Sequence, residues 1–193
     1  MTDTERVLRV AGPVAIVVAF GGILSAVAVA PWFSWSGNAL SDLGEAGRAS
    51  SPFFNGGLVL AGGLGVAYAG YLRTVARNVL HRLAVATHVA AMLGLAGVGI
   101  AHVPHRLHLP AAVAAYLGFT ATLVLWGAGT VRDGIRIRGA ASVFAGVGHL
   151  AVWVLWALFL VPWLPGLAVP ETVGALLYAG WVFGVTRGTH DAR

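Results

Sequence analysis

The sequence contains no cysteine and no lysine, and it has few charged residues of any kind. Without cysteine, the chain has no disulfide, no thiolate nucleophile and no cysteine-ligated metal site. Charged residues make up only 10% of the 193 residues, whereas about 25% is usual in a soluble domain. Apolar residues make up 58%, and the mean hydropathy is +0.82. This composition excludes disorder and a soluble globule, and it indicates an integral membrane protein.

Six apolar runs are long enough to cross a bilayer, which takes about 20 residues of helix. They cover residues 9–30, 52–72, 83–103, 110–131, 140–163 and 170–186. The remaining residues leave no room for a separate soluble domain, so residues 1–193 are expected to form a single transmembrane domain. The predicted fold class is therefore all-α, an integral membrane bundle of six helices.

All twelve basic residues are arginines, and ten of them flank the predicted spans on one side. The other side carries only Arg48 and Arg106. Arginine-rich short loops stay in the cytoplasm, so we predict a multi-pass protein of a prokaryotic plasma membrane with both termini cytoplasmic. The net charge of +5 is carried by too few residues to indicate nucleic-acid binding. The expected environment is the lipid bilayer.

The longest predicted outward loop, residues 31–51, is a candidate functional segment. At this length a loop is more than a connector, and such loops are often functional. Its tryptophans and leucines are typical of a segment that lies at the membrane interface. It also carries two carboxylates, Asp42 and Glu45. We expect polar chemistry to gather on this outer face, where arginine is scarce.

Three histidines follow each other at three-residue spacing in the next outward loop: His102, His105 and His108. With the carboxylates Asp42 and Glu45 of the first loop, or with Glu171, they would supply the nitrogen and oxygen ligands that zinc prefers. A metal there would activate water against a lipid ester or phosphate. The spacing matches no standard zinc signature. The alternative is that these histidines hydrogen-bond lipid headgroups or the first loop.

Two further histidines, His88 and His149, lie within predicted spans. Ionisable residues inside the bilayer are candidates for function. Facing imidazoles on two helices are how a helical bundle ligates haem, so this pair is the candidate cofactor site. The alternative is that each ring hydrogen-bonds a buried backbone or side-chain group.

Three segments resemble a family of bacterial and archaeal membrane proteins catalogued as domain of unknown function 998 (DUF998). They are Asn38-Ala-Leu-Ser-Asp-Leu-Gly44, Pro52-Phe-Phe-Asn55 before a glycine-rich span, and Gly99-Ile-Ala-His-Val-Pro104 followed by His108. The resemblance covers most of the chain through short motifs. It implies a six-span bundle with no established activity. It also implies that Ser41, Asp42, Asn55 and His108 belong to one polar cluster on the outer face. With Asn38, the first residue of the first motif, the candidate cluster is Asn38, Ser41, Asp42, Asn55 and His108.

The sequence thus favours a protein that uses an extracytoplasmic polar cluster to bind lipid headgroups, a membrane-protein partner or a second copy of itself. Two alternatives stay open. One is a metal-dependent intramembrane hydrolase that acts on lipid, and the other is a b-type haem protein of the membrane. Whether the protein is an enzyme is not decided by the sequence, and neither is a cofactor.

The arginine distribution makes a testable statement about orientation. Reporter fusions in the segment 73–82 should report a cytoplasmic location, and fusions in the segment 104–109 an external one. The physical reason is the cost of moving guanidinium groups across the membrane. A reporter at 73–82 that is accessible from outside the cell would show that the predicted topology is inverted.

Overall fold

The computed structural model describes residues 2–188, and this part of the chain is helical without any strand. Each of its six long helices is apolar and long enough to cross a membrane, which confirms the predicted fold class. The helices are α1 (Asp3–Ala28), α2 (Ser51–Val75), α3 (Val79–Ile100), α4 (His108–Arg132), α5 (Arg136–Leu155) and α6 (Ala168–Gly188). A short 3-10 helix, η1 (Leu40–Gly44), follows α1, and a π-helical turn, η2 (Trp156–Leu160), extends α5.

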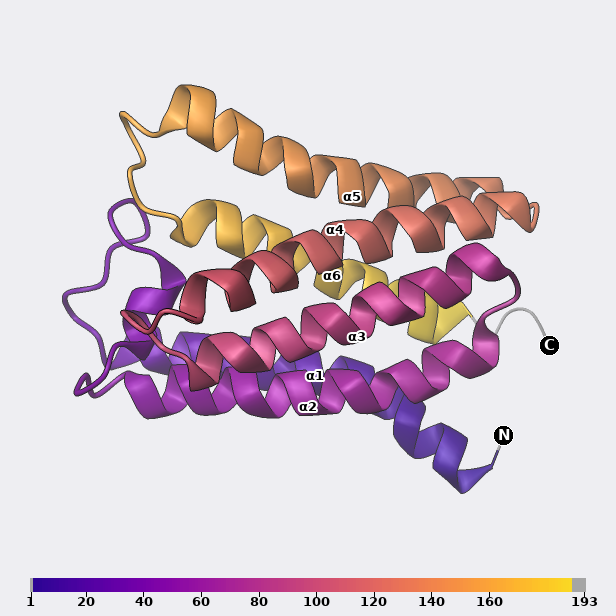
Figure 1. Ribbon diagram of the computed structural model, residues 1–193, viewed down its shortest axis with the longest axis horizontal. Coiled ribbons are helices and arrows are strands. Elements are labelled where there is room, and N and C mark those ends of the chain that lie inside the picture. Colours follow the sequence, from indigo (N-terminus) through magenta and orange to yellow (C-terminus); the bar gives the residue numbers. More distant parts are fainter. Residues whose placement is uncertain (1, 189–193) are drawn as a thin grey trace.

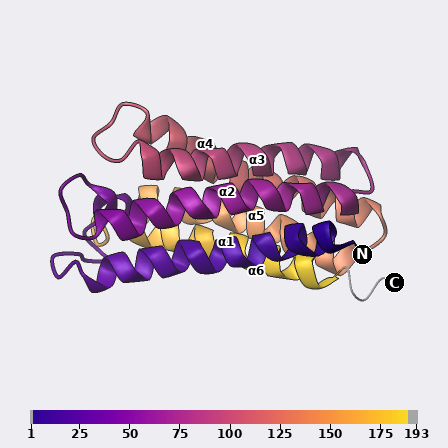
Figure 2. The ribbon, with the colours of Figure 1, turned by 90° about the horizontal axis from the view of Figure 1, so that it is seen from below.

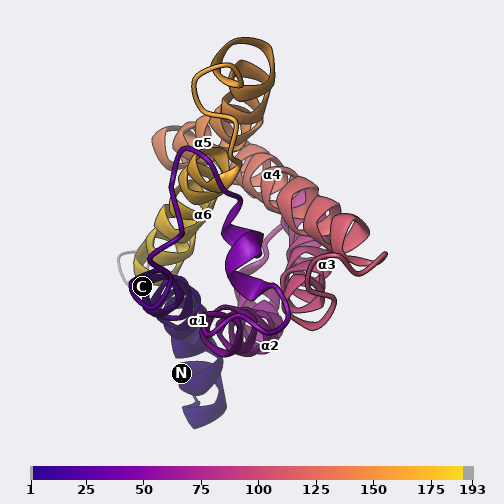
Figure 3. The same ribbon diagram turned by 90° about the vertical axis from the view of Figure 1, so that its left-hand side faces the viewer.

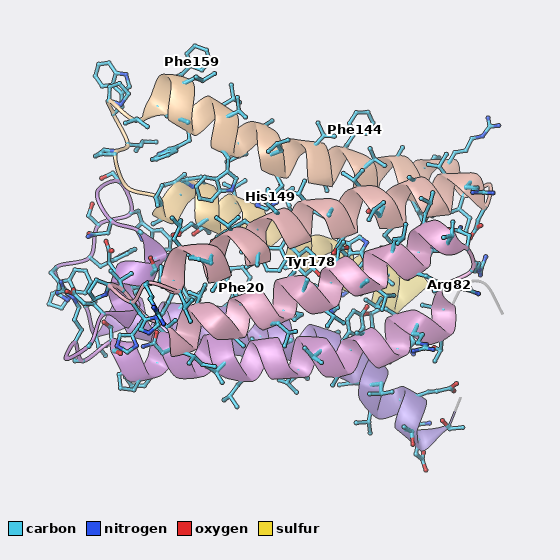
Figure 4. All side chains as sticks on the ribbon, viewed as in Figure 1. Phe20, Arg82, Phe144, His149, Phe159 and Tyr178 are labelled. Atoms are coloured by element: carbon cyan, nitrogen blue, oxygen red, sulfur yellow. The ribbon has the colours of Figure 1, made fainter. Side chains whose placement is uncertain are left out.

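Five of the helices form a ring when the molecule is viewed along its long axis (Figure 3). Helices α1 to α4 pack against each other in chain order, and α6 closes the ring by contacting both α1 and α4. Helix α5 lies outside the ring, against α4 and α6. Phe144 of α5 and Phe159 of η2 are 75% and 63% exposed and point away from the bundle (Figure 4). Such exposed apolar side chains suit contact with lipid.

The two ends of the bundle differ. At one end lie both termini and the short turns between α2 and α3 and between α4 and α5, while the longer loops and η1 lie at the other (Figures 1 and 2). Nine of the ten arginines predicted for one side fall at the end with the termini, and Arg193 lies outside the described residues. We refer to these as the arginine end and the loop end.

Local sequence signals explain where the helices begin. The Thr2 hydroxyl accepts a hydrogen bond from the Glu5 amide while the Glu5 carboxylate accepts from the Thr2 amide. This capping box starts α1 well before the apolar run that begins at residue 9. Asn78 caps α3 by accepting from two amides, those of Leu80 and His81.

Glycines allow the helices to approach closely, as expected where lipid supplies no hydrophobic force between them. A Cβ atom placed on Gly22 of α1 would lie 2.7 Å from the Phe53 carbonyl and 2.9 Å from the Gly57 Cα. A Cβ on Gly62 of α2 would lie 2.7 Å from the Met92 carbonyl of α3. Helices α2 and α3 thus pack closely through small residues, and α1 and α2 pack in the same way.

Gly21 and Gly22 offer a matched test of this packing. Gly22→Ala should destabilise the bundle by about 1–3 kcal/mol, because its methyl group would force α1 and α2 apart. Gly21→Ala should be neutral or slightly stabilising, since nothing lies within 4 Å of the added Cβ. Unfolding of both variants in detergent, followed by circular dichroism, measures the difference. Equal free energies of unfolding for the two variants would contradict the view that close contact between α1 and α2 at Gly22 stabilises the bundle.

Candidate functional site

An elongated chamber of about 100 Å³ lies inside the ring and is lined by α1, α2, α3, α4, α6 and η1. On α6 its lining extends from Glu171 in the first turn to Val182, about 16 Å of helix rise. Most of the wall is apolar, with residues such as Ala15, Leu58 and Ala115. The chamber is therefore a long, narrow, apolar space that runs along the axis of the bundle.

The short helix η1 covers the chamber at the loop end (Figure 3). Its Leu40 and Leu43 are buried, and Leu40 lines the chamber together with Ser41. The turn is held by Asp42, whose Oδ2 accepts from the Asn38 side-chain amide and from the Ala39 backbone amide, each at 3.0 Å. Asp42 thus fixes the turn of η1 through hydrogen bonds within the same segment.

Helix α2 holds the far side of this cap. The Ser50 hydroxyl donates to the Leu43 carbonyl at 2.7 Å, and the Asn55 side-chain amide donates to the Gly44 carbonyl at 2.9 Å. A Cβ on Gly44 would lie 2.8 Å from the Phe54 ring, so η1 sits directly on the start of α2. The Asn55 Oδ1 atom is buried and has no hydrogen-bond partner among residues 2–188.

Helix α6 holds the cap from the opposite side. The Ala168 amide donates to the Asn38 carbonyl at 2.9 Å, and the Leu40 amide donates to Glu171 Oε2 at 2.6 Å. These bonds join the first loop to the start of the last helix. The cap is therefore fixed by segments that are more than a hundred residues apart in the chain.

Glu171 is a buried acidic side chain in the lining of the chamber. It is only 7% exposed, and within residues 2–188 neither arginine nor histidine forms an ion pair with it. A buried carboxylate is costly unless donors satisfy it, and here the Leu40 amide satisfies one oxygen. Ser41 and His108 line the chamber together with Glu171. The polar cluster predicted for the outer face does not include Glu171. An acidic residue at the start of an apolar span is nevertheless a sequence signal for a functional group.

His108 stands at the start of α4, and its Nδ1 lies 2.9 Å from the Ala101 carbonyl. Because a carbonyl only accepts, Nδ1 carries the proton, and a neutral ring then keeps Nε2 as an acceptor. Of the five residues of the predicted cluster, Asn38 and Asp42 bond each other, and Asn55 reaches the same short helix. His108 and Ser41 share the chamber wall instead.

The three histidines of the loop do not converge. The His105 Nδ1 accepts from the Leu107 amide, whereas His108 faces Ala101. Across the described part of the chain, no three histidine, aspartate or glutamate side chains are placed to hold a metal ion. The candidate metal set His102, His105 and His108 is thus not assembled in this structure.

The two histidines within the spans belong to separate networks. His88 Nε2 lies 2.8 Å from the Gly65 carbonyl and Nδ1 contacts the Tyr178 hydroxyl, so both ring nitrogens are engaged. His149 Nδ1 lies 2.9 Å from the Thr120 hydroxyl. His88 therefore has no nitrogen left for iron, and the residues present do not fit a haem held by this pair. The alternative expectation, hydrogen bonds to buried groups, describes both rings.

The inner part of the chamber is closed by aromatic side chains around His88. Tyr68, from α2, and Tyr178, from α6, line the chamber beside it, and Figure 4 shows Tyr178 among the ring helices. The Tyr68 hydroxyl lies 2.8 Å from the Thr186 hydroxyl. Together with the contacts of His88 to Gly65 and Tyr178, this hydrogen bond joins α2, α3 and α6 at the inner end of the chamber.

A comparison with known protein families matches residues 11–188 to the family described as "Protein of unknown function (DUF998)". The match covers nearly the whole chain. Comparisons with curated proteins and with solved structures gave no match.

Asp42 is expected to be the residue that keeps the cap folded. Asp42→Ala should make the amides of residues 38–44 exchange hydrogen at least about tenfold faster, because a hydrogen bond to a charged group contributes about 1.5–3 kcal/mol. Hydrogen exchange read by mass spectrometry on peptides from this loop measures the change.

Glu45→Ala is the matched control for this experiment, since its carboxylate is largely exposed and pairs with the neighbouring Arg48. Its exchange rates at 38–44 should stay within about twofold of the parent protein, because the energy of such an exposed pair is small. An unchanged rate in Asp42→Ala would contradict the assignment of Asp42 as the anchor.

Proposed function

The chain belongs to the DUF998 family, whose function is unknown, and we propose that it binds one lipid-like amphiphile in its capped chamber. The observation that carries the proposal is a single buried carboxylate, Glu171, at the closed end of a long apolar space. The hydrocarbon chain lies along the axis of the ring, and the polar head lies beneath η1. The protein is thus a binding protein for an amphiphile.

The apolar walls set the shape of the ligand but not its chemistry. A bilayer is as apolar as the chamber, so moving a hydrocarbon chain from one to the other brings little free energy. The length of the lining, about 16 Å along α6, accommodates an extended chain rather than a bulky ring system. Selectivity among lipids must therefore come from the head group.

The polar groups of the chamber favour a head group that donates hydrogen bonds. Glu171 offers carboxylate oxygen, and a neutral His108 offers Nε2 as a second acceptor. An alcohol or an ammonium group donates hydrogen bonds to such acceptors, whereas an ionised carboxylate or phosphate head has no hydrogen to donate to them. The class of ligand we propose is accordingly a long-chain alcohol or amine.

The orientation predicted from the arginine distribution assigns the cap of the chamber to one side of the membrane. With the arginine end in the cytoplasm, the cap and Glu171 face the outer leaflet. The proposal keeps the lipid-headgroup binding favoured by the sequence, but it moves the binding site from the loop surface into the chamber beneath the loop.

A hydrolytic role is the second reading of the same residues, because serine, histidine and carboxylate are the groups of many ester hydrolases. In the residues that the structure describes, no hydrogen bond joins Ser41 to His108. The Nδ1 of His108 faces Ala101 and not Glu171, whose Oε2 accepts from Leu40. Binding is the function that this arrangement favours.

Ligand selectivity tests the proposal directly. In phosphatidylcholine nanodiscs, dodecylamine and dodecan-1-ol should raise the unfolding temperature of the protein, while dodecanoate should not. Glu171→Gln should weaken the stabilisation by dodecylamine about tenfold in ligand concentration, because it removes a charge-assisted hydrogen bond.

Two variants of α4 show whether the chamber itself is the site. Ala112 lines the chamber, so Ala112→Phe fills it and should abolish the stabilisation. Ala114 is exposed on the same helix, and Ala114→Phe should behave like the parent protein. Stabilisation by dodecanoate equal to that by dodecylamine, or full stabilisation of Ala112→Phe, would overturn the proposal.

A further inference from the structure

A second and larger cavity, of about 810 Å³, lies at the arginine end of the bundle. It is lined by α4, α5 and α6 and by residues at and next to the turn between α2 and α3. Its depth is lined by apolar side chains, including Trp126, Leu177 and Trp181. It shares no lining residue with the central chamber. We refer to it as the arginine-end cavity.

The face of α6 in this cavity is smooth and open. Leu176, Gly180 and Gly184 recur every four residues and all line the cavity. Nothing lies within 4 Å of a Cβ placed on Gly180 or on Gly184. On the opposite wall, Ala141 and Ala145 of α5 also leave room. The space between α5 and α6 therefore has the width for a hydrocarbon chain.

Positive charge surrounds the same cavity. Arg77 comes from the α2–α3 turn, Arg138 from the start of α5 and Arg187 from the end of α6. The Nη1 of Arg138 lies 3.4 Å from the Gly188 carbonyl and donates to it, which holds its guanidinium against the end of α6. Arginines from three separate elements thus line the same cavity.

The carboxylate of the cavity is already engaged. Asp133 Oδ1 accepts from the Asn78 side-chain amide at 2.9 Å, and Oδ2 lies 3.8 Å from His81 Nδ1. This bonding links the start of α3 to the end of α4. Among the described residues that line the cavity, three are arginines and one is an aspartate that is already hydrogen-bonded, so positive groups outnumber negative ones in the lining, which suits an anionic ligand.

The length of the cavity matches one leaflet of a membrane. Leu176 and Arg187 both line it and are separated by about 16 Å of helix rise. Half of the roughly 30 Å hydrocarbon core of a bilayer is about 15 Å. A lipid whose phosphate lies at the arginines would thus place its acyl chain beside Gly184, Gly180 and Leu176 in turn.

We propose that the arginine-end cavity binds one acidic phospholipid of the adjacent leaflet. Its phosphate lies among Arg77, Arg138 and Arg187, where planar guanidinium groups donate paired hydrogen bonds to phosphate oxygens. Its acyl chain lies in the space between α5 and α6. Basic pockets between membrane helices bind acidic headgroups in this way, and the apolar depth favours a lipid over free phosphate.

The test uses the full chain in nanodiscs that contain equal amounts of phosphatidylglycerol and phosphatidylcholine. Native mass spectrometry should show one phosphatidylglycerol retained, in excess over phosphatidylcholine. Each arginine at an acidic lipid surface contributes roughly fivefold in binding, so Arg77→Gln/Arg187→Gln should lower this preference about 25-fold.

Arg73→Gln/Arg82→Gln is the matched control, because it removes the same charge from the same end at exposed residues outside the cavity. Figure 4 shows Arg82 at this end. The control should keep the lipid preference within about twofold. Equal loss in both double variants would mean that surface charge alone attracts the lipid, and it would overturn the proposal.

The acyl-chain part is tested by Gly184→Leu, which places a side chain into the space along α6 while leaving every arginine in place. It should abolish retention of the lipid. Gly63→Leu, at an exposed glycine of α2 with nothing within 4 Å of its Cβ, should have no effect. Full retention in Gly184→Leu would overturn the cavity as the site, whatever the outcome for the central chamber.

Discussion

The structure depends on close backbone contact between helices that gain little from burying apolar side chains. In a bilayer, lipid chains solvate leucine as well as another helix does, so small residues and a few hydrogen bonds must hold the bundle. Gly22 against Gly57 joins α1 to α2, and Gly62 against Met92 joins α2 to α3. The ring of five helices follows from such contacts, with α6 closing it between α1 and α4. The central chamber lies inside this ring.

Two groups of hydrogen bonds hold the two ends of the central chamber. One group fixes the cap: Asp42 shapes η1, Asn55 joins it to α2, and Glu171 joins it to α6. A second group, around His88 and Tyr178, closes the chamber from below. Most of the wall between these two groups is apolar, with residues such as Ala15, Leu58 and Ala115.

The two cavities have opposite chemistry. The central chamber presents a buried carboxylate beneath the cap, whereas the arginine-end cavity presents three guanidinium groups. Under the two proposals, the chamber would take a head group that donates hydrogen bonds and the arginine-end cavity an anionic one. Along α6 the chamber is lined from Glu171 to Val182 and the arginine-end cavity from Leu176 to Gly188, so the two spaces overlap in depth but share no lining residue.

Composition and periodicity determined that this chain is a membrane protein of six helices, because apolar runs of spanning length leave no other fold. They also determined that arginines gather at one end, and the short motifs around Asn38, Asn55 and His108 identified the family. Only the tertiary structure decided which polar groups meet. Glu171 lies more than a hundred residues from Leu40, and a bond over that distance leaves no trace in local spacing. For the same reason the regular spacing of His102, His105 and His108 suggested a metal site that the fold does not assemble, since the loop turns these side chains toward different neighbours.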